Sequence, residues 1–197
     1  MGKKVVAIVG SYRKGGIVDR AVEAVLEGAR ENGAETHTIY LIEQQIEFCT
    51  NCRQCAEKPG KERGKCVRHD GLEAILTEIE AADAMVLGSP VNFYNVTALY
   101  RRFLERLIGC TYWPPKWAPR ARTKLLPRKA VLVASAGMPG FLIPLLTGAA
   151  RALRISSNLL GAQTIGRLWI GLVASGAHPP LSGNVLKRAR LLGMKLA

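Results

Sequence analysis

The sequence predicts a three-layer α/β fold, in which helices cover both faces of a doubly wound, five-stranded parallel sheet. Apolar runs alternate with longer segments whose apolar residues recur at helical spacing. Most of these runs are continuous, as expected for strands that are buried on both faces. No shift in composition divides the 197 residues, so we expect a single domain over residues 1–197.

The N-terminal half begins with an apolar run that ends at Gly10, and a helical pattern follows that Asn32-Gly33 should end. The next segment alternates and is rich in β-branched residues, which is typical of a strand. Asp70 followed by Glu73 predicts a capping box at the start of another helix. The predicted elements are strands at 4–9, 35–41 and 84–87, and helices at 17–31, 70 to about 81, and 97–107.

In the C-terminal half we expect strands at 130–134 and 163–170 and helices at 142–160 and 182–196. Two long segments lie outside these elements. A cysteine-rich loop covers about 43–69, and a loop of that length is uncommon unless it is functional or held by a ligand. An excursion rich in Pro, Trp and Arg covers about 108–128. It could be a lid, a contact between subunits, a membrane-surface contact, or a loop that packs its tryptophans on the body.

The net charge of +13 is concentrated in the second half of the chain. Glu105 is the last acidic residue, and residues 106–197 contain 14 Lys and Arg residues. This distribution favours an anionic partner such as a phosphorylated cofactor or an anionic membrane surface, or it is a plain basic surface. We expect no nucleic-acid partner, because no nucleic-acid-binding fold accompanies the charge. No apolar run approaches ~18 residues, and the N-terminal run is too short for a signal peptide, so we expect a cytoplasmic protein.

Ligands of an open parallel sheet bind outside the carboxyl ends of the strands. Residues 10–16 follow the first predicted strand and offer a hydroxyl from Ser11, cations from Arg13 and Lys14, glycines and a helix N-terminus. This combination suits a phosphate, because free N–H groups and the helix dipole both favour an anion. The loop matches neither the Walker pattern nor GxGxxG, so an ordinary strand-to-helix turn is the alternative.

Two further loops lie at the same edge of the sheet. Residues 88–97 place Phe93, Tyr94 and two asparagines after a central strand, where they could pack on a flat ring and bond its rim. The alternative is a packed turn in which Asn95 or Thr97 caps the next helix. Residues 135–140 are small and flexible enough to pass beside a ring system.

Together the three loops resemble the NAD(P)H-dependent FMN reductase family of the flavodoxin-like fold, over almost the whole chain. Ser11 and Arg13 match its phosphate loop, but Ile17 and Val18 stand where Asn and Thr usually bond the phosphate. Losing such bonds costs about 1–2 kcal/mol each unless backbone N–H groups and cations compensate. The resemblance implies that FMN is bound by Ser11, Arg13, Lys14, Gly16, Ile17, Val18, Pro90, Val91, Asn92, Phe93, Tyr94, Asn95, Ser135, Ala136 and Gly137.

Four cysteines, Cys49, Cys52, Cys55 and Cys66, lie close together and suggest metal or redox chemistry more than disulfides. Their spacing resembles the motif of iron–sulfur flavoproteins, a branch of the same family, which implies that they ligate a [4Fe–4S] cluster. The last gap is longer than is usual in that branch, so Zn²⁺ and no metal stay as alternatives. Nearby cations would lower the pKa of these thiols. The cations are Lys58, Lys61, Arg63 and Lys65.

The resemblance implies an oxidoreductase that takes electrons from NAD(P)H or a ferredoxin-like carrier protein. The acceptor would be a quinone, a metal ion, dioxygen or a protein. No catalytic side chain is expected, because the flavin itself carries the chemistry. A homodimer or homotetramer that completes the flavin site is also implied. The alternatives are a flavodoxin-like electron carrier without substrate turnover, and a basic scaffold that has lost FMN.

Overall fold

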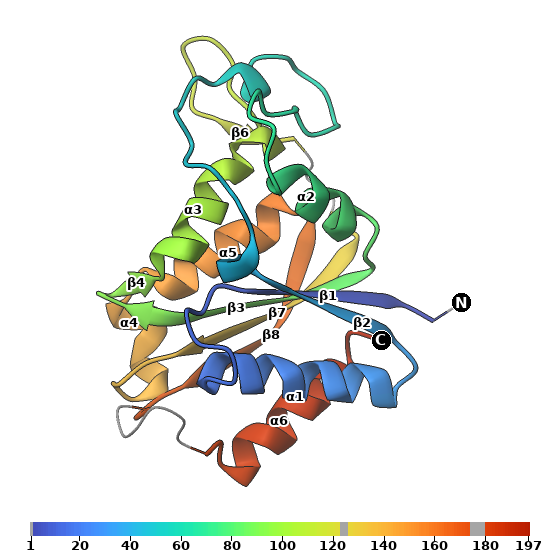
Figure 1. Ribbon diagram of the computed structural model, residues 1–197, viewed down its shortest axis with the longest axis vertical. Coiled ribbons are helices and arrows are strands. Elements are labelled where there is room, and N and C mark those ends of the chain that lie inside the picture. The colour runs from blue at the N-terminus through green and yellow to red at the C-terminus, as the bar shows by residue number, and fades with distance from the viewer. Residues whose placement is uncertain (1, 123–125, 174–179) are drawn as a thin grey trace.

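The computed structural model describes residues 2–122, 126–173 and 180–197. Its central sheet has the order β2-β1-β3-β7-β8 with all neighbours parallel, and β4 adds an antiparallel pair beside β3. Figure 1 shows this sheet between two layers of helices, which confirms the predicted fold class. The strands are β1 (Lys4–Val9), β2 (Glu35–Tyr40), β3 (Ala84–Asn92), β4 (Asn95–Val96), β7 (Arg128–Ser135) and β8 (Ala162–Ile170).

Each face of the sheet has its own hydrophobic core. Helices α1 and α6 cover one face, and α2, α3 and α5 cover the other. Gly28 of α1 and Gly193 of α6 let these two helices pack closely, because an added Cβ at either would collide with backbone of the other. Within the described ranges, no helix is long and apolar enough to cross a membrane. The helices are α1 (Ile17–Glu31), α2 (Leu72–Glu80), α3 (Ala98–Arg106), α4 (Ile143–Leu146), α5 (Ala149–Leu159) and α6 (Gly183–Met194).

Three local expectations were wrong. The third strand continues beyond Leu87 to Asn92 and turns back as β4. The helix predicted at 142–160 is broken into α4 and α5, because Thr147 is extended (φ −129°, ψ 153°) and the Gly148 N–H bonds Tyr94 O at 2.8 Å. The capping box does not form, because the Glu73 carboxylate pairs with Arg63.

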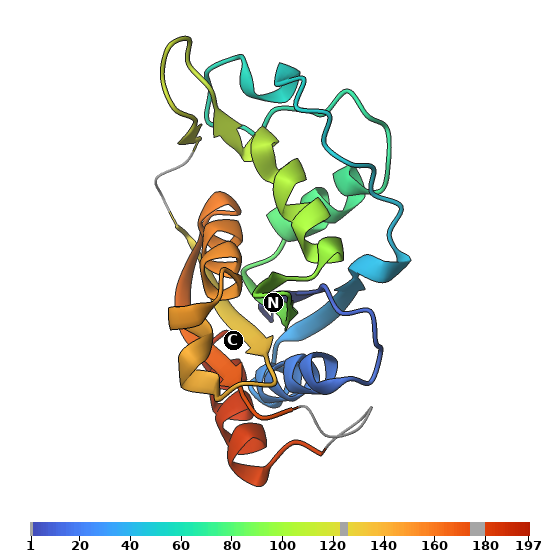
Figure 2. The ribbon, with the colours of Figure 1, turned by 90° about the vertical axis from the view of Figure 1, so that its left-hand side faces the viewer.

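The two long segments outside the sheet pack against each other and form one lobe, drawn at the top of Figures 1 and 2. Trp113 N–H donates to Ala56 O at 2.8 Å, and Gly64 N–H donates to Gly109 O at 2.9 Å. The Arg53 guanidinium lies 4.0 Å from the centre of the Trp113 ring. The lobe contains the short helices η2 (Gln54–Ala56) and η3 (Leu107–Cys110) and the ribbon β5 (Thr111–Tyr112) and β6 (Arg120–Ala121).

The arrangement of the lobe bears on the excursion at 108–128. Trp113 is half-buried and contacts Arg53 and Ala56 of the cysteine-rich loop, whereas Trp117 is 67% exposed. Positions 123–125 of this excursion lie outside the described residues. The lobe therefore joins the predicted excursion to the cysteine-rich loop, although the two are separate in the sequence.

Candidate functional site

A pocket of about 390 Å³ lies where β1, β3, β7 and β8 end at their carboxyl edge. It gathers the three loops that the sequence singled out, from parts of the chain more than a hundred residues apart. Eleven of the fifteen residues named above as cofactor contacts line it. None of the described residues of the 108–128 excursion does. The lining residues are Ser11, Tyr12, Arg13, Gly16, Ile17, Val18, Pro90, Val91, Asn92, Ser135, Ala136, Gly137 and Val173.

The first loop is held in shape by its own hydroxyl group. Ser11 Oγ accepts a hydrogen bond from the Arg13 N–H and donates to the Arg13 carbonyl, both at 3.1 Å. Gly15 adopts a positive φ of 71°, which a residue with a side chain rarely tolerates. Gly16 then caps α1 and has no side chain to offer the first N–H groups of the helix, while the Asp19 carboxylate accepts the Gly15 N–H at 2.5 Å. This loop presents backbone donors and the positive end of a 15-residue helix.

Lys14 does not line the pocket, although the sequence placed it among the cofactor contacts. Its ammonium group pairs with Glu43 and lies 4.3 Å from the centre of the Tyr40 ring. Burial and the neighbouring Asp19 raise the pKa of Tyr40 to about 12, so the phenol stays neutral beside the lysine. Arg13 is therefore the cation of this loop that lies at the pocket.

Ile17 and Val18 line the pocket with apolar groups. Val18 is 2% exposed and packs with Val22 against Gly88 of β3, where an added Cβ would lie 3.0 Å from Val18 Cγ1. Ile17 is half-buried and packs on the same core. Neither side chain can bond an anion, so the polar groups of this loop are its backbone donors, Ser11 and Arg13.

The second loop is a β-hairpin. Only its first arm, which contains Pro90, Val91 and Asn92, lines the pocket. Phe93 and Tyr94 form the two-residue turn with φ of 44° and 61°, and their side chains are 101% and 68% exposed. Neither lines the pocket, so the structure does not place them against a ring within it. Two positive φ angles in bulky residues are strained, and such strain is concentrated at functional sites.

Asn95 does not line the pocket either. Its Oδ1 accepts a hydrogen bond from the Val96 N–H at 2.9 Å, and its amide packs against Gly148. Side-chain bonding within the hairpin is the physical reason that this asparagine is turned away.

Thr97 connects the first two loops. Its Oγ1 donates to the Gly10 carbonyl at 2.6 Å and accepts from the Tyr100 N–H at 3.1 Å, which caps α3. Ser89 Oγ accepts from the Thr97 N–H at 3.1 Å. Both side chains are fully buried. The sequence indicates the cap, but only the fold shows that the same hydroxyl bridges to a residue 87 positions away.

Two lining residues were missed. Tyr12 stands inside the loop that was already singled out and is 48% exposed at the pocket. Val173 follows β8, and its N–H bonds the Ala136 carbonyl of the third loop at 3.3 Å. The rule that ligands gather at strand carboxyl ends also applies to β8, and it could have identified Val173.

The four clustered cysteines lie in the lobe, away from this pocket. Cys55 is buried, Cys49 and Cys66 are half-buried, and Cys52 is exposed. Within the described ranges, no three His, Cys, Asp or Glu side chains are close enough together to hold a metal ion. The four cysteines nevertheless stand on the same loop of the lobe.

The expected lowering of thiol pKa values does not occur at Cys55. Burial is the largest effect and, with the charges of the other cysteines, raises the pKa of this thiol. Arg63, one of the cations expected to lower it, is instead bonded to Glu73 and Glu80 at 2.7 and 2.6 Å. Cys110 is buried as expected, and burial raises its pKa to about 12.

The sequence profile of a family described as NADPH-dependent FMN reductase matches residues 3–173. An iron-sulfur flavoprotein of Archaeoglobus fulgidus is 33% identical over 111 residues, which cover 56% of this chain and 48% of that protein. An iron-sulfur flavoprotein of Methanocaldococcus jannaschii is 36% identical over 103 residues, covering 52% and 51%. The chain thus spans about half the length of the curated relatives it matches.

Solved structures with the same fold are more distant in sequence. An NAD(P)H:quinone oxidoreductase from Methanothermobacter marburgensis superposes with a TM-score of 0.70 at 19% identity, covering 100% of both chains. An azoreductase from Bacillus anthracis reaches 0.72 at 15% identity, covering 98% of this chain and 99% of that one. At such identities the likeness establishes the fold.

Proposed function

Because the chain belongs to the NADPH-dependent FMN reductase family, we propose that it binds FMN in the pocket at the strand carboxyl ends and acts as an NAD(P)H-dependent oxidoreductase. The observation that carries this proposal is the convergence of the three loops on one pocket of about 390 Å³. Pockets of roughly 300–1,000 Å³ suit small molecules and cofactors. FMN supplies the ability to accept a hydride and to release electrons singly.

The phosphate of FMN would lie against the first loop. The N-terminus of α1, where Gly16 supplies no side-chain cap, offers backbone N–H groups, and Arg13 adds a charge-assisted partner at the pocket. Ser11 contributes by holding the loop through its two bonds to Arg13. Backbone N–H donors and the Arg13 cation would thus bind the phosphate in place of polar side chains at positions 17 and 18, which are apolar here.

The ring system would lie between the second and third loops. Pro90 to Asn92 form one wall of the pocket and Ser135 to Gly137 form the other. The hydrogen bonds of Thr97 to Gly10 and Ser89 fix the spacing of the first two loops before any ligand binds. Such pre-organisation reduces the entropy cost of binding.

We further propose a [4Fe–4S] cluster on Cys49, Cys52, Cys55 and Cys66. Four thiols are the usual ligand set of such a cluster, and these four stand on one loop. Their separations in the structure do not form a coordination shell, so the loop must close for the cluster to bind. The names of the relatives add support, since they are iron-sulfur flavoproteins.

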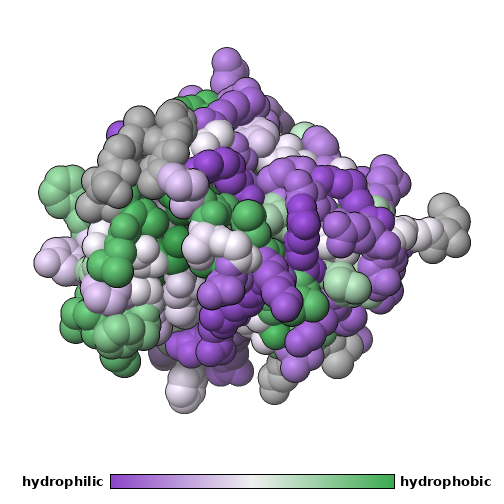
Figure 3. Space-filling model, turned by 90° about the horizontal axis from the view of Figure 1, so that it is seen from below, coloured by the Kyte–Doolittle hydropathy of each residue, from purple (hydrophilic) through white to green (hydrophobic). Residues whose placement is uncertain are grey.

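We also propose that the protein forms a homo-oligomer through the surface beside the pocket. Figure 3 shows hydrophobic side chains gathered on the left of the molecule, the side where Figure 1 draws β4 and α4. Tyr94 O bonds Gly148 N, and Leu172 N bonds Met138 O, so the hairpin turn and the end of β8 flank α4. The exposed residues here are Phe93 (101%), Tyr94 (68%), Phe141 (71%), Leu145 (74%), Leu146 (57%) and Leu172 (71%).

An absorption spectrum of protein purified without oxygen, with iron and acid-labile sulfide assays, tests the cofactor proposals. Flavin bands that NAD(P)H bleaches, with about four irons per chain, would support both FMN and the cluster. Flavin bands without iron would refute the cluster proposal and support an FMN reductase without a cluster. Flavin that NAD(P)H does not bleach would favour an electron carrier. Protein that neither carries nor takes up FMN would refute the oxidoreductase proposal.

A further inference from the structure

A second cavity of about 500 Å³ lies at the opposite edge of the sheet. It opens beside Arg128, where β7 begins, whereas the first pocket includes Ser135, where β7 ends. The two share no lining residue, and neither the proposed flavin site nor the proposed cluster occupies this cavity. It is lined by Lys61, Glu62, Arg63, Lys65, Leu76, Ile79, Glu80, Cys110, Arg122, Pro127, Arg128, Leu159, Leu160 and Gly161.

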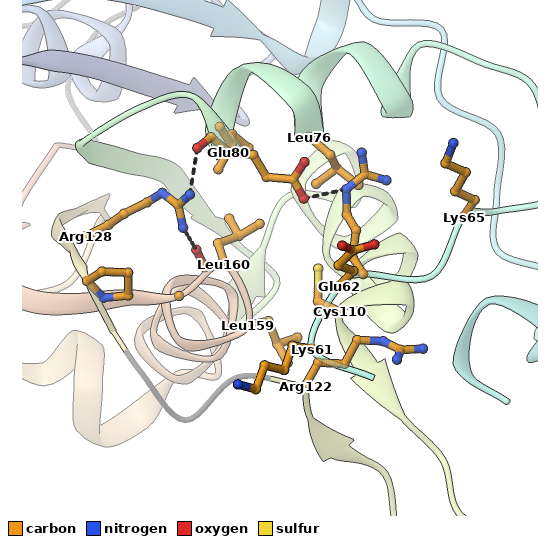
Figure 4. Close-up of a pocket in the computed structure, with 14 residues that line it drawn as sticks. Lys61, Glu62, Lys65, Leu76, Glu80, Cys110, Arg122, Arg128, Leu159 and Leu160 are labelled. Atoms are coloured by element: carbon orange, nitrogen blue, oxygen red, sulfur yellow. Dashed lines mark hydrogen bonds and ion pairs between the residues drawn. The ribbon is translucent and has the colours of Figure 1, made fainter. Parts of the chain in front are cut away.

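The floor of the cavity is apolar. Leu76 and Ile79 of α2 and Leu160 at the end of α5 are at most 7% exposed, so they belong to the core beneath the cavity. Leu159 is half-buried, and Cys110 contributes a thiol. Figure 4 shows Cys110, Leu159 and Leu160 grouped in the middle of the close-up, with charged side chains around them. An apolar floor of this kind suits the body of an organic ligand.

Two of the cations around this floor are fixed in position by backbone carbonyls. Arg122 donates to the carbonyls of Gly109, Cys55 and Lys58 at 2.9, 3.0 and 2.9 Å. Arg128 donates to the carbonyls of Ala82, Glu80 and Leu160, and Figure 4 draws the last two of these bonds. Carbonyls satisfy the donors of a guanidinium but carry no net charge. Both arginines therefore keep their full positive charge while losing little freedom when a ligand arrives.

The remaining charges leave the cavity positive. Arg63 and Glu80 neutralise each other in an ion pair at 2.6 Å, and Glu73 is a second partner of Arg63. Lys61 and Lys65 are exposed at the rim, and neither forms a hydrogen bond or ion pair with any residue that the structure describes. Glu62 is the one lining carboxylate outside an ion pair, among the same residues. The lining thus contains two fixed guanidiniums and two lysines but only one carboxylate outside an ion pair, around an apolar floor.

We propose that this cavity is a second binding site, which takes a small amphipathic anion with a carboxylate or phosphate head and an aromatic or short aliphatic body. The body would cover Leu159 and Leu160, and the head would lie at the rim beside Lys61, in the positive field of the two fixed arginines. A charge-assisted hydrogen bond to the Lys61 ammonium group is about twice as strong as a neutral one, so the head selects anions.

Ligand binding here would also act on the cysteine-rich loop. The wall at Lys61 and Lys65 belongs to that loop, and Arg122 bonds the carbonyls of Cys55 and Lys58 within it. A ligand that orders this wall stabilises the segment between Cys55 and Cys66. The proposal itself concerns binding and does not depend on FMN or on a cluster.

Calorimetric titration of FMN-loaded protein with naphthoate, naphthyl phosphate and the neutral naphthamide tests the proposal. We expect one site per chain for at least one of the two anions and binding about tenfold weaker or worse for the amide. Preference between the two anions identifies the head group. Because FMN is already bound, saturable binding reports a site other than the flavin pocket, and the flavin absorbance of the same sample tests the proposed function separately.

Matched charge reversals locate the site. The double variant Lys61→Glu/Lys65→Glu changes two exposed lysines at the cavity and should weaken anion binding about tenfold or more. The double variant Lys3→Glu/Lys187→Glu makes the same change in net charge at exposed positions elsewhere and should alter affinity less than about twofold. Leu159→Trp should fill the cavity and abolish binding. No saturable binding, equal affinity for the amide, or equal loss in both double variants would overturn the proposal.

Discussion

Arg106 and Asp70 form a buried, two-pronged ion pair that closes the neck of the cysteine-rich loop. Arg106 Nη1 lies 2.6 Å from Asp70 Oδ2 and Nη2 lies 3.2 Å from Oδ1, with side chains 1% and 7% exposed. The same Asp70 Oδ2 accepts the Glu47 N–H, and Arg106 Nη1 donates to the Glu47 carbonyl at 2.7 Å. Glu47 stands just before Cys49 and Asp70 just after Cys66, so this contact joins the two ends of the loop.

Breaking the pair should be costly. Arg106→Met leaves Asp70 buried without its cation, and we expect the free energy of unfolding to fall by about 3–5 kcal/mol. Arg101→Met on the same helix removes an exposed pair with Glu105 and should cost no more than about 0.5 kcal/mol. Urea denaturation of both variants measures the difference, and equal small losses would show that the neck is not held by this contact.

The pair also predicts a dependence on pH. Burial raises the pKa of Asp70, but hydrogen bonds from Arg106 and from the N–H groups of Glu47 and Leu72 outweigh this effect and hold the pKa below its usual 3.8. A lowered folded-state pKa gives stability that is complete above about pH 5 and is lost as the pH falls through the folded value. The stability gap between wild type and Asp70→Asn should therefore be constant from pH 7 to about 5 and shrink below about 4. A gap that instead widens in acid would contradict this assignment.

Arg13 and Lys14 should differ in their effect on FMN affinity. Arg13→Ala removes the cation at the pocket and should weaken FMN by about tenfold or more, since a hydrogen bond to a charged group is worth about 1.5–3 kcal/mol. Lys14→Ala should have a much smaller effect, because Lys14 is paired with Glu43. Riboflavin lacks the phosphate, and its affinity should be unchanged in both variants. Fluorescence titration measures the affinities of both variants for FMN and for riboflavin. If Arg13→Ala weakened riboflavin as much as FMN, Arg13 would not be the residue that binds the phosphate.

Thr97 should be needed for the shape of the pocket as well as for stability. Thr97→Val deletes the hydroxyl that bonds Gly10 and Tyr100 and leaves buried groups without partners, at a cost of about 2 kcal/mol or more. Thr97→Ser keeps the hydroxyl and should retain most of the stability. The midpoint temperature of thermal unfolding and the affinity for FMN should both fall in the valine variant. A valine variant as stable as the serine one would show that the bridge contributes little.

The turn at Phe93 tests the proposed oligomer. Phe93→Asn removes a fully exposed aromatic ring and places at φ 44° a residue type that tolerates positive φ. The free energy of unfolding of the variant subunit should be at least that of the wild type. In light-scattering measurements, the variant oligomer should dissociate at a higher protein concentration than the wild-type oligomer. Met194→Asn, an exposed change on α6, is the control and should not shift assembly. Unchanged assembly in both variants would refute the proposal that this surface forms the subunit interface.

Periodicity in the sequence predicted the sheet, because strands buried on both faces must be continuously apolar, as in residues 4–9. The helix at 17–31 was predicted to the residue, since Asn32-Gly33 ends it. The break between α4 and α5 could not be predicted. It depends on Gly148 meeting Tyr94 and Asn95, residues more than fifty positions away.

By itself the sequence determined the fold class, the three loops of the pocket and the cysteines of the lobe, because apolar periodicity, glycine placement and residue type are local properties. Only the tertiary structure decided which side chains of those loops face the pocket. Lys14 turns to Glu43, and Phe93 points to solvent. The structure also decided that Arg106 and Asp70 close the cysteine-rich loop. The direction of a side chain is fixed by the partners that folding brings beside it. These partners are distant in the chain, so the local sequence does not reveal them.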